Sequence, residues 1–142
     1  MTQQLIFQPV GALAFLTFAV LSIIPLRRFA AGRQGLVKTR DFRYGESAAV
    51  PGEVSIPNRN YVNLLELPIL FYVVALMYKV SGKVDGFVLG MAWTYAALRA
   101  IHSAIHLTYN NVTHRLGAFS ASNIVLMAPR TSSWDGSGSE TL

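Results

Sequence analysis

The chain has 142 residues, of which 52% are hydrophobic and 13% are charged, and it has no cysteine. This composition excludes a disordered chain, disulfides, thiolate metal sites and a cysteine nucleophile. The net charge of +5 would suit a nucleic-acid binder, but the basic residues gather between long apolar runs. We therefore expect a membrane protein with no nucleic-acid partner.

The first predicted element is a transmembrane helix over residues 5–26. Residues 1–26 contain no charged side chain, and about 20 apolar residues span a bilayer. No Lys or Arg precedes this run, which is also longer than the apolar part of a signal peptide, so we expect a retained helix. Seven of the twelve Lys and Arg residues lie in residues 27–60. The positive-inside rule therefore predicts that this loop is cytoplasmic.

The second and third helices are predicted over residues 61–80 and 84–109. Residues 61–78 contain one charged side chain, Glu66, and residues 86–114 contain one, Arg99. An ionisable residue inside a membrane is costly, so it usually has a partner and a function. Between the two charges along the chain, Pro68 removes a helical hydrogen bond and is expected to kink the second helix.

The third predicted helix carries a polar stripe. At about 100° per residue, Tyr95, Arg99, His102, His106 and Asn110 lie along one side of the helix. A purely structural span does not need such a side. We therefore interpret the stripe as a candidate functional surface.

The second helix carries a matching stripe, made by Arg59, Asn63 and Glu66 at positions i, i+4 and i+7. A rise of about 1.5 Å per residue places Glu66 and His102 at similar depths, and the long side chain of Arg99 can reach the same level. The sequence therefore predicts that Glu66 pairs with Arg99 and His102.

The fourth predicted segment covers residues 116–130, and its apolar part is too short to cross a bilayer comfortably. Residues 131–142 read as a polar tail rich in Ser and Gly. The predicted fold is an all-α, multi-pass integral membrane four-helix bundle whose fourth helix is short or atypical. We expect one transmembrane domain over residues 1–130, with membrane lipid around it.

The pattern Arg59-x3-Asn63-x2-Glu66-x-Pro68, followed by an Arg-x2-His-x3-His pattern at residues 99–106, resembles the MAPEG family. These are membrane-associated proteins in eicosanoid and glutathione metabolism. The resemblance covers residues 27–115 and is greatest to small bacterial members, which would place the chain in a bacterial inner membrane. It implies a homotrimer that holds glutathione between subunits, and a transferase or peroxidase that acts on lipophilic electrophiles.

The resemblance also implies roles for single residues. By position, the glutathione contacts would be Arg28, Arg59, Asn63, Glu66, Arg99 and His102. Arg115 would stabilise the glutathione thiolate, since a nearby guanidinium favours the ionised thiol. His106 stands where many catalytic members have a tyrosine, and an imidazole can donate a hydrogen bond or act as an acid or base.

Two alternatives remain open. A non-catalytic MAPEG-like membrane subunit or binding protein is favoured by His106 and the short fourth segment, whereas Arg115 and the complete second-helix motif favour an enzyme. A metal site is the other alternative, since His102 and His106 are spaced to share a metal with Glu66 as a third ligand. A cationic Arg99 in the same stripe disfavours a metal, so we expect none.

Overall fold

The computed structural model describes residues 2–128, and within this range the chain forms long helices and no β-strand. The predicted tail at residues 131–142 lies outside the described residues. In chain order the elements are η1 at Gln3–Ile6, α1 at Phe7–Arg33, η2 at Thr39–Phe42, α2 at Gly52–Glu66, α3 at Pro68–Val80, α4 at Gly86–Leu107 and α5 at Val112–Met127, where η marks a 3-10 turn.

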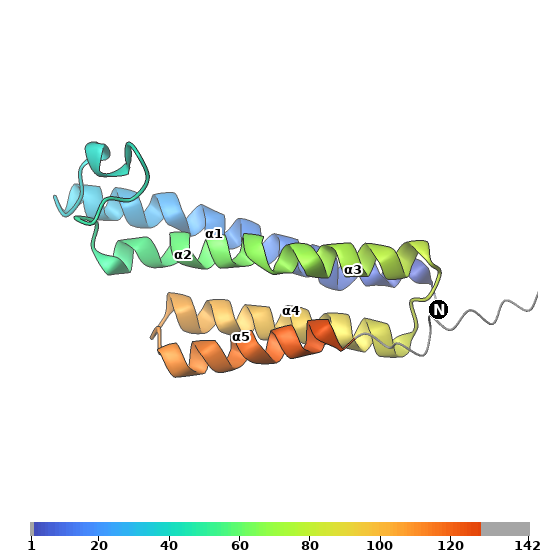
Figure 1. Cartoon of the computed structure of the whole chain (residues 1–142). Coiled ribbons are helices and arrows are strands. Elements are labelled where there is room, and N and C mark those ends of the chain that lie inside the picture. The colour runs from blue at the N-terminus through green and yellow to red at the C-terminus, as the bar shows by residue number, and fades with distance from the viewer. Residues whose placement is uncertain (1, 129–142) are drawn as a thin grey trace, which may run out of the picture.

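The helices form a bundle of four rods, because α2 and α3 lie end to end (Figure 1). α1 packs beside α2 and α3, and α4 packs beside α5, while α1 and α2 also contact α4. The loop of residues 34–51 and the turn between α4 and α5 lie at one end of the bundle, whereas the turn of residues 81–85 lies at the other (Figure 1). The predicted all-α four-helix fold is confirmed.

Proline positions account for one correct and one wrong prediction. The second rod is interrupted at Leu67, directly before Pro68, as the sequence predicts. The second helix was predicted to start near residue 61, but Pro57 lies inside α2 with its ring buried, although a Pro-Asn pair is a common turn signal. The second rod therefore begins at Gly52 rather than near residue 61. Likewise, α1 continues past residue 26, so the first basic residues of the predicted loop are helical.

Short polar side chains set the starts of the last two helices. Asp85 caps α4 by accepting a hydrogen bond from the Val88 N–H at 2.8 Å, and Asn111 caps α5 by accepting one from the His114 N–H at 3.1 Å. The end of α3 is set by Gly82, whose φ of +68° allows the left-handed turn that closes the helix.

The rods differ in how well they suit a membrane. Among the described residues, two stretches are long and apolar enough to cross one, Gln3–Arg33 and Gly52–Val80. α4 has 22 residues, or about 33 Å, and matches the bilayer core of about 30 Å in length. α5 has 16 residues, or about 24 Å, which fits the short fourth helix that the sequence predicts.

Candidate functional site

The polar stripe of α4 points into the bundle. Arg99 has an exposed fraction of 0%, and His102 and His106 are 3% and 2% exposed. Tyr95 and Ser103, on the same side of the helix, are also buried. The interior of the chain is therefore polar near the end of the bundle that carries the long loop.

Arg99 is a buried cation that forms no salt bridge with the described residues. Its Nη2 donates a hydrogen bond to the main-chain oxygen of Asn63 at 2.7 Å, and its guanidinium lies 5.5 Å from the centre of the Phe119 ring. Its Nε and Nη1 have no hydrogen-bond partner, and the described residues give it no ion pair. The predicted pair with Glu66 does not form a salt bridge, because the carbonyl of Asn63 takes the place of the carboxylate, and Glu66 acts on Arg99 only through its charge.

The direction in which α2 faces explains why Arg99 contacts the carbonyl of Asn63 and not the carboxylate of Glu66. The inward side of the second rod consists of Pro57, Asn60, Leu64, Pro68, Phe71, Ala75 and Tyr78. The predicted stripe lies to one side of this face, since each residue turns the helix by about 100°. Arg59 and Glu66 are therefore exposed, and Asn63 is half-buried. Two opposite charges lie on the outer surface of this rod.

Two polar residues outside the predicted stripes join α2 to α4. Asn60 is 0% exposed and accepts a hydrogen bond from the Ser103 hydroxyl at 3.2 Å. This contact lies one helical turn from the contact between Asn63 and Arg99, and the Nδ2 of Asn60 has no partner in the described chain. Ser103 follows Arg99 by four residues, so helical spacing was the signal that could have found it.

His102 connects the stripe to α5. Its Nδ1 lies 3.1 Å from the main-chain oxygen of Arg115 and must donate, because a carbonyl only accepts. The rings of His102 and His106 meet edge to face with centroids 5.9 Å apart. The Nε2 of His102 and the Nδ1 of His106 have no partner among the described residues, so both nitrogens are available to a bound molecule.

Arg115 lies in the first turn of α5 and is half-buried. Its Nη1 donates a hydrogen bond to the side-chain oxygen of Asn110 at 2.8 Å. Asn110 has a φ of +47°, and its N–H closes the end of α4 by bonding to the carbonyl of Ile105. The turn between α4 and α5 thus holds the Arg115 side chain beside the end of the polar stripe.

Arg28 lies elsewhere, near the end of α1. It forms an ion pair with Glu46 at 2.9 Å, and its guanidinium lies 4.5 Å from the centre of the Phe42 ring. In the described residues it contacts no other predicted site residue. The structure therefore joins Asn63, Arg99, His102, His106 and Arg115 by contacts. Glu66 and Arg59 lie near enough for their charges to act on Arg99 and His106, whereas Arg28 lies apart.

The hypothesis of a metal site gains no support. It needs Glu66 as the third ligand beside His102 and His106, and Glu66 lies on the outer surface of α2. The described residues contain no group of three side chains able to hold a metal ion.

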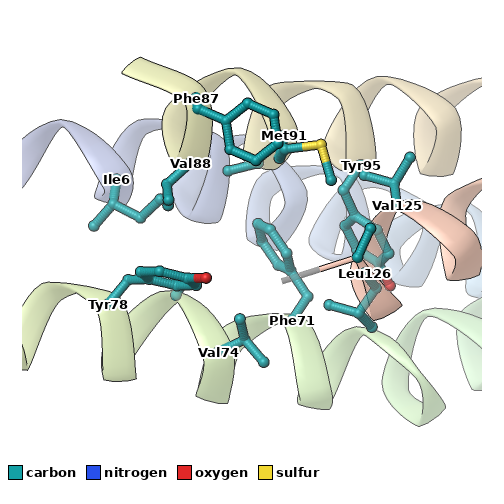
Figure 2. A pocket seen from close by; sticks show the side chains of 13 residues that line it. Ile6, Phe71, Val74, Tyr78, Phe87, Val88, Met91, Tyr95, Val125 and Leu126 are labelled. Carbon is teal, nitrogen blue, oxygen red and sulfur yellow. The ribbon is translucent and has the colours of Figure 1, made fainter. Parts of the chain in front are cut away.

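A small apolar cavity lies beyond Tyr95, among η1, α3, α4 and α5. Its volume is about 50 Å³, and Figure 2 shows Phe71, Met91 and Leu126 around it. The rings of Phe71 and Tyr95 stack with centroids 4.6 Å apart and close one side. The cavity has room for a few water molecules, whereas a lipophilic substrate needs about 300 Å³ or more. Such a substrate does not fit there.

Comparison with known families identifies the chain. The sequence profile of the MAPEG family matches residues 6–128, a range that includes α1 to α5. The chain belongs to the MAPEG family. Comparisons with curated proteins and with solved structures gave no match.

Membership in the MAPEG family explains why the outer surface of the bundle exposes large apolar side chains. MAPEG proteins are membrane helical bundles of a glutathione-related transferase and peroxidase type, so this MAPEG protein is a membrane protein. Its α1 helix exposes Phe15 and Phe18 by 74% and 67%. In water such a surface would favour aggregation, whereas in a bilayer it contacts lipid.

Proposed function

We propose that this MAPEG protein is a glutathione-dependent transferase or peroxidase that acts on lipophilic electrophiles. Arg99 is the observation that carries the proposal. It is a fully buried cation with two unpartnered nitrogens and no salt bridge in the described chain. An unpaired buried charge costs several kcal/mol. An anionic ligand would remove that cost, and glutathione supplies two carboxylates.

The outer stripe of α2 supports the same ligand. Arg59 is complementary to a carboxylate and Glu66 to an ammonium group. Seven residues separate them, or about 10 Å along the helix, and an extended tripeptide also spans about 10 Å. Exposed charges on a membrane-crossing rod need polar partners. We therefore propose a homotrimer in which glutathione lies between α2 and a neighbouring subunit.

In this proposal Arg115 and His106 carry the chemistry. A free thiol has a pKa of about 8.5, and the guanidinium of Arg115 favours the reactive thiolate. The unpartnered Nδ1 of His106 is available to donate a hydrogen bond or to transfer a proton. The electrophile enters from the bilayer, since the apolar cavity inside the chain is too small for it.

One observation favours the second candidate, a non-catalytic glutathione-binding membrane subunit. The guanidinium of Arg115 already donates to Asn110, and its main-chain oxygen already accepts from His102. In this second candidate Arg115 fixes the turn between α4 and α5 and takes no part in chemistry. Glutathione would then bind near Arg99 without forming a thiolate.

The test is glutathione binding to the full chain purified in detergent. Calorimetry measures binding, and ultraviolet absorbance measures the thiolate at neutral pH. The enzyme proposal expects both signals, together with turnover of a lipophilic electrophile. Binding without thiolate absorbance or turnover would establish the second candidate. No binding at millimolar glutathione would overturn both.

A further inference from the structure

A groove with a volume of about 790 Å³ lies between the last turns of α1 and the loop of residues 34–51. Its apolar lining includes Ile24 and Phe29 from α1, and Val37 and Phe42 from the loop. Arg33 and Lys38 add two cations to the lining. The groove is therefore amphipathic.

The loop that forms this groove is anchored. Glu46 reaches back to Arg28 on α1 at 2.9 Å, and Phe42 packs under the same guanidinium. Val37 and Val50 are buried in a cluster with residues of α1 and α2. The groove is thus preformed, and the charge of Arg28 within it is already neutralised by Glu46.

The other two cations lack acidic partners. Arg33 and Lys38 are exposed, and the described residues give neither an ion pair. The nearest acidic residue along the chain, Asp41, accepts a hydrogen bond from the main-chain N–H of Lys38 at 2.8 Å. The groove therefore offers two free positive charges to an anion.

We propose that this groove binds an anionic phospholipid. The phosphate lies between Arg33 and Lys38, and an acyl chain follows Ile24 and Phe29 along α1. The apolar lining favours a lipid over a soluble anion. Leu26 and Phe29 are 67% and 71% exposed on a membrane-crossing rod, so the groove opens where lipid headgroups meet the helix. Arg28, a glutathione contact by resemblance, also lines this groove, but its charge is paired with Glu46, so the proposal does not rest on glutathione binding.

The first test removes the charges. The full chain in non-ionic detergent is titrated with phosphatidylglycerol, with phosphatidylcholine and with inorganic phosphate, and bound lipid is detected by native mass spectrometry. Combined Arg33→Gln and Lys38→Gln should weaken phosphatidylglycerol binding about tenfold or more. Combined Arg40→Gln and Arg43→Gln is the matched control, because these cations lie in the same loop outside the groove lining. The control should change binding by less than about twofold.

The second test fills the groove without changing its charge. Gly32 lies in the lining, and a Cβ added there meets no atom within 4 Å. Gly32→Leu should therefore fold and exclude the acyl chain, whereas Gly32→Ala should bind phosphatidylglycerol almost normally. This variant keeps the proposal testable even if the charge variants do not fold.

Several results would overturn the proposal. Equal losses in the two charge pairs would show a general attraction to the loop. Equal binding of phosphatidylcholine, or tight binding of inorganic phosphate that survives Gly32→Leu, would show that the groove does not select an anionic lipid. No phosphatidylglycerol binding by the unaltered protein would overturn the proposal directly.

Discussion

The Arg99→Met substitution tests whether Arg99 binds a ligand or only stabilises the fold. The substitution removes the charge-assisted hydrogen bond from Nη2 to the carbonyl of Asn63, whose length is 2.7 Å. Such a bond contributes about 1.5–3 kcal/mol. The substitution also removes the cost of burying a cation that has two unpartnered nitrogens, which is several kcal/mol. The two effects oppose each other, and the second is at least as large.

We therefore expect Arg99→Met to leave the free energy of unfolding unchanged, or to raise it by about 1–4 kcal/mol, when glutathione is absent. Glutathione binding should weaken about 100-fold, which corresponds to a loss of about 3 kcal/mol for one buried carboxylate contact. Asn123→Leu on α5 is a matched control, because it removes another buried atom without a partner but no charge.

The assay is thermal unfolding of the full chain in detergent, with and without glutathione. Glutathione at about 100 times its dissociation constant should stabilise the unaltered protein by about 2.7 kcal/mol and the variant hardly at all. The reasoning is refuted if Arg99→Met lowers the free energy of unfolding by about 3 kcal/mol or more while the stabilisation by glutathione persists. Arg99 would then be a structural residue whose charge is compensated in the assembled protein.

Arg115→Ala should abolish thiolate absorbance and turnover while leaving glutathione affinity within about threefold, because the interaction acts on the reacting state; unchanged turnover would assign Arg115 to the turn alone. Asn110→Gly keeps the left-handed backbone at φ +47° but releases the guanidinium of Arg115. It should lower thiolate absorbance while leaving the unfolding temperature almost unchanged. Glu66→Gln should weaken glutathione binding about tenfold with little effect on the stability of the isolated subunit, since Glu66 is exposed; unfolding of the subunit would contradict this. For topology, Tyr44→Cys and Ser81→Cys should react with an impermeant thiol reagent from opposite sides of the membrane, and labelling from one side only would overturn the predicted orientation.

The sequence predicted the number of rods and the inward stripe of α4, and both follow from local rules. Apolar runs of membrane length indicate where the chain can cross a bilayer. The spacing of Arg99, His102 and His106 places them on one side of a helix, and the cost of ionisable groups in lipid turns that side inward. The structure shows all three buried.

The ends of the helices were harder to predict, because apolar composition marks where lipid ends and not where a helix ends. α1 continues through its basic residues to Arg33, and the turn that stops it has Gly35 at a φ of +73°. A glycine just past the last helical residue is a recognised stop signal. The end of α1 is therefore marked by Gly35 and not by the first arginine, Arg27.

The direction in which α2 faces was not predictable from its own sequence. Asn60 lies in a helical row that is otherwise apolar, and an apolar row suits lipid as well as a bundle interior. Periodicity alone therefore does not choose between that row and the polar row of Arg59, Asn63 and Glu66. The contact with Ser103 on α4 turns Asn60 inward. That contact consequently turns Arg59 and Glu66 outward, where no residue described in the same chain pairs with them. Polar groups that find partners within the subunit hold the fold, whereas those without a partner, inside or outside the bundle, need a ligand or a neighbouring subunit. Only packing distinguishes the two sets.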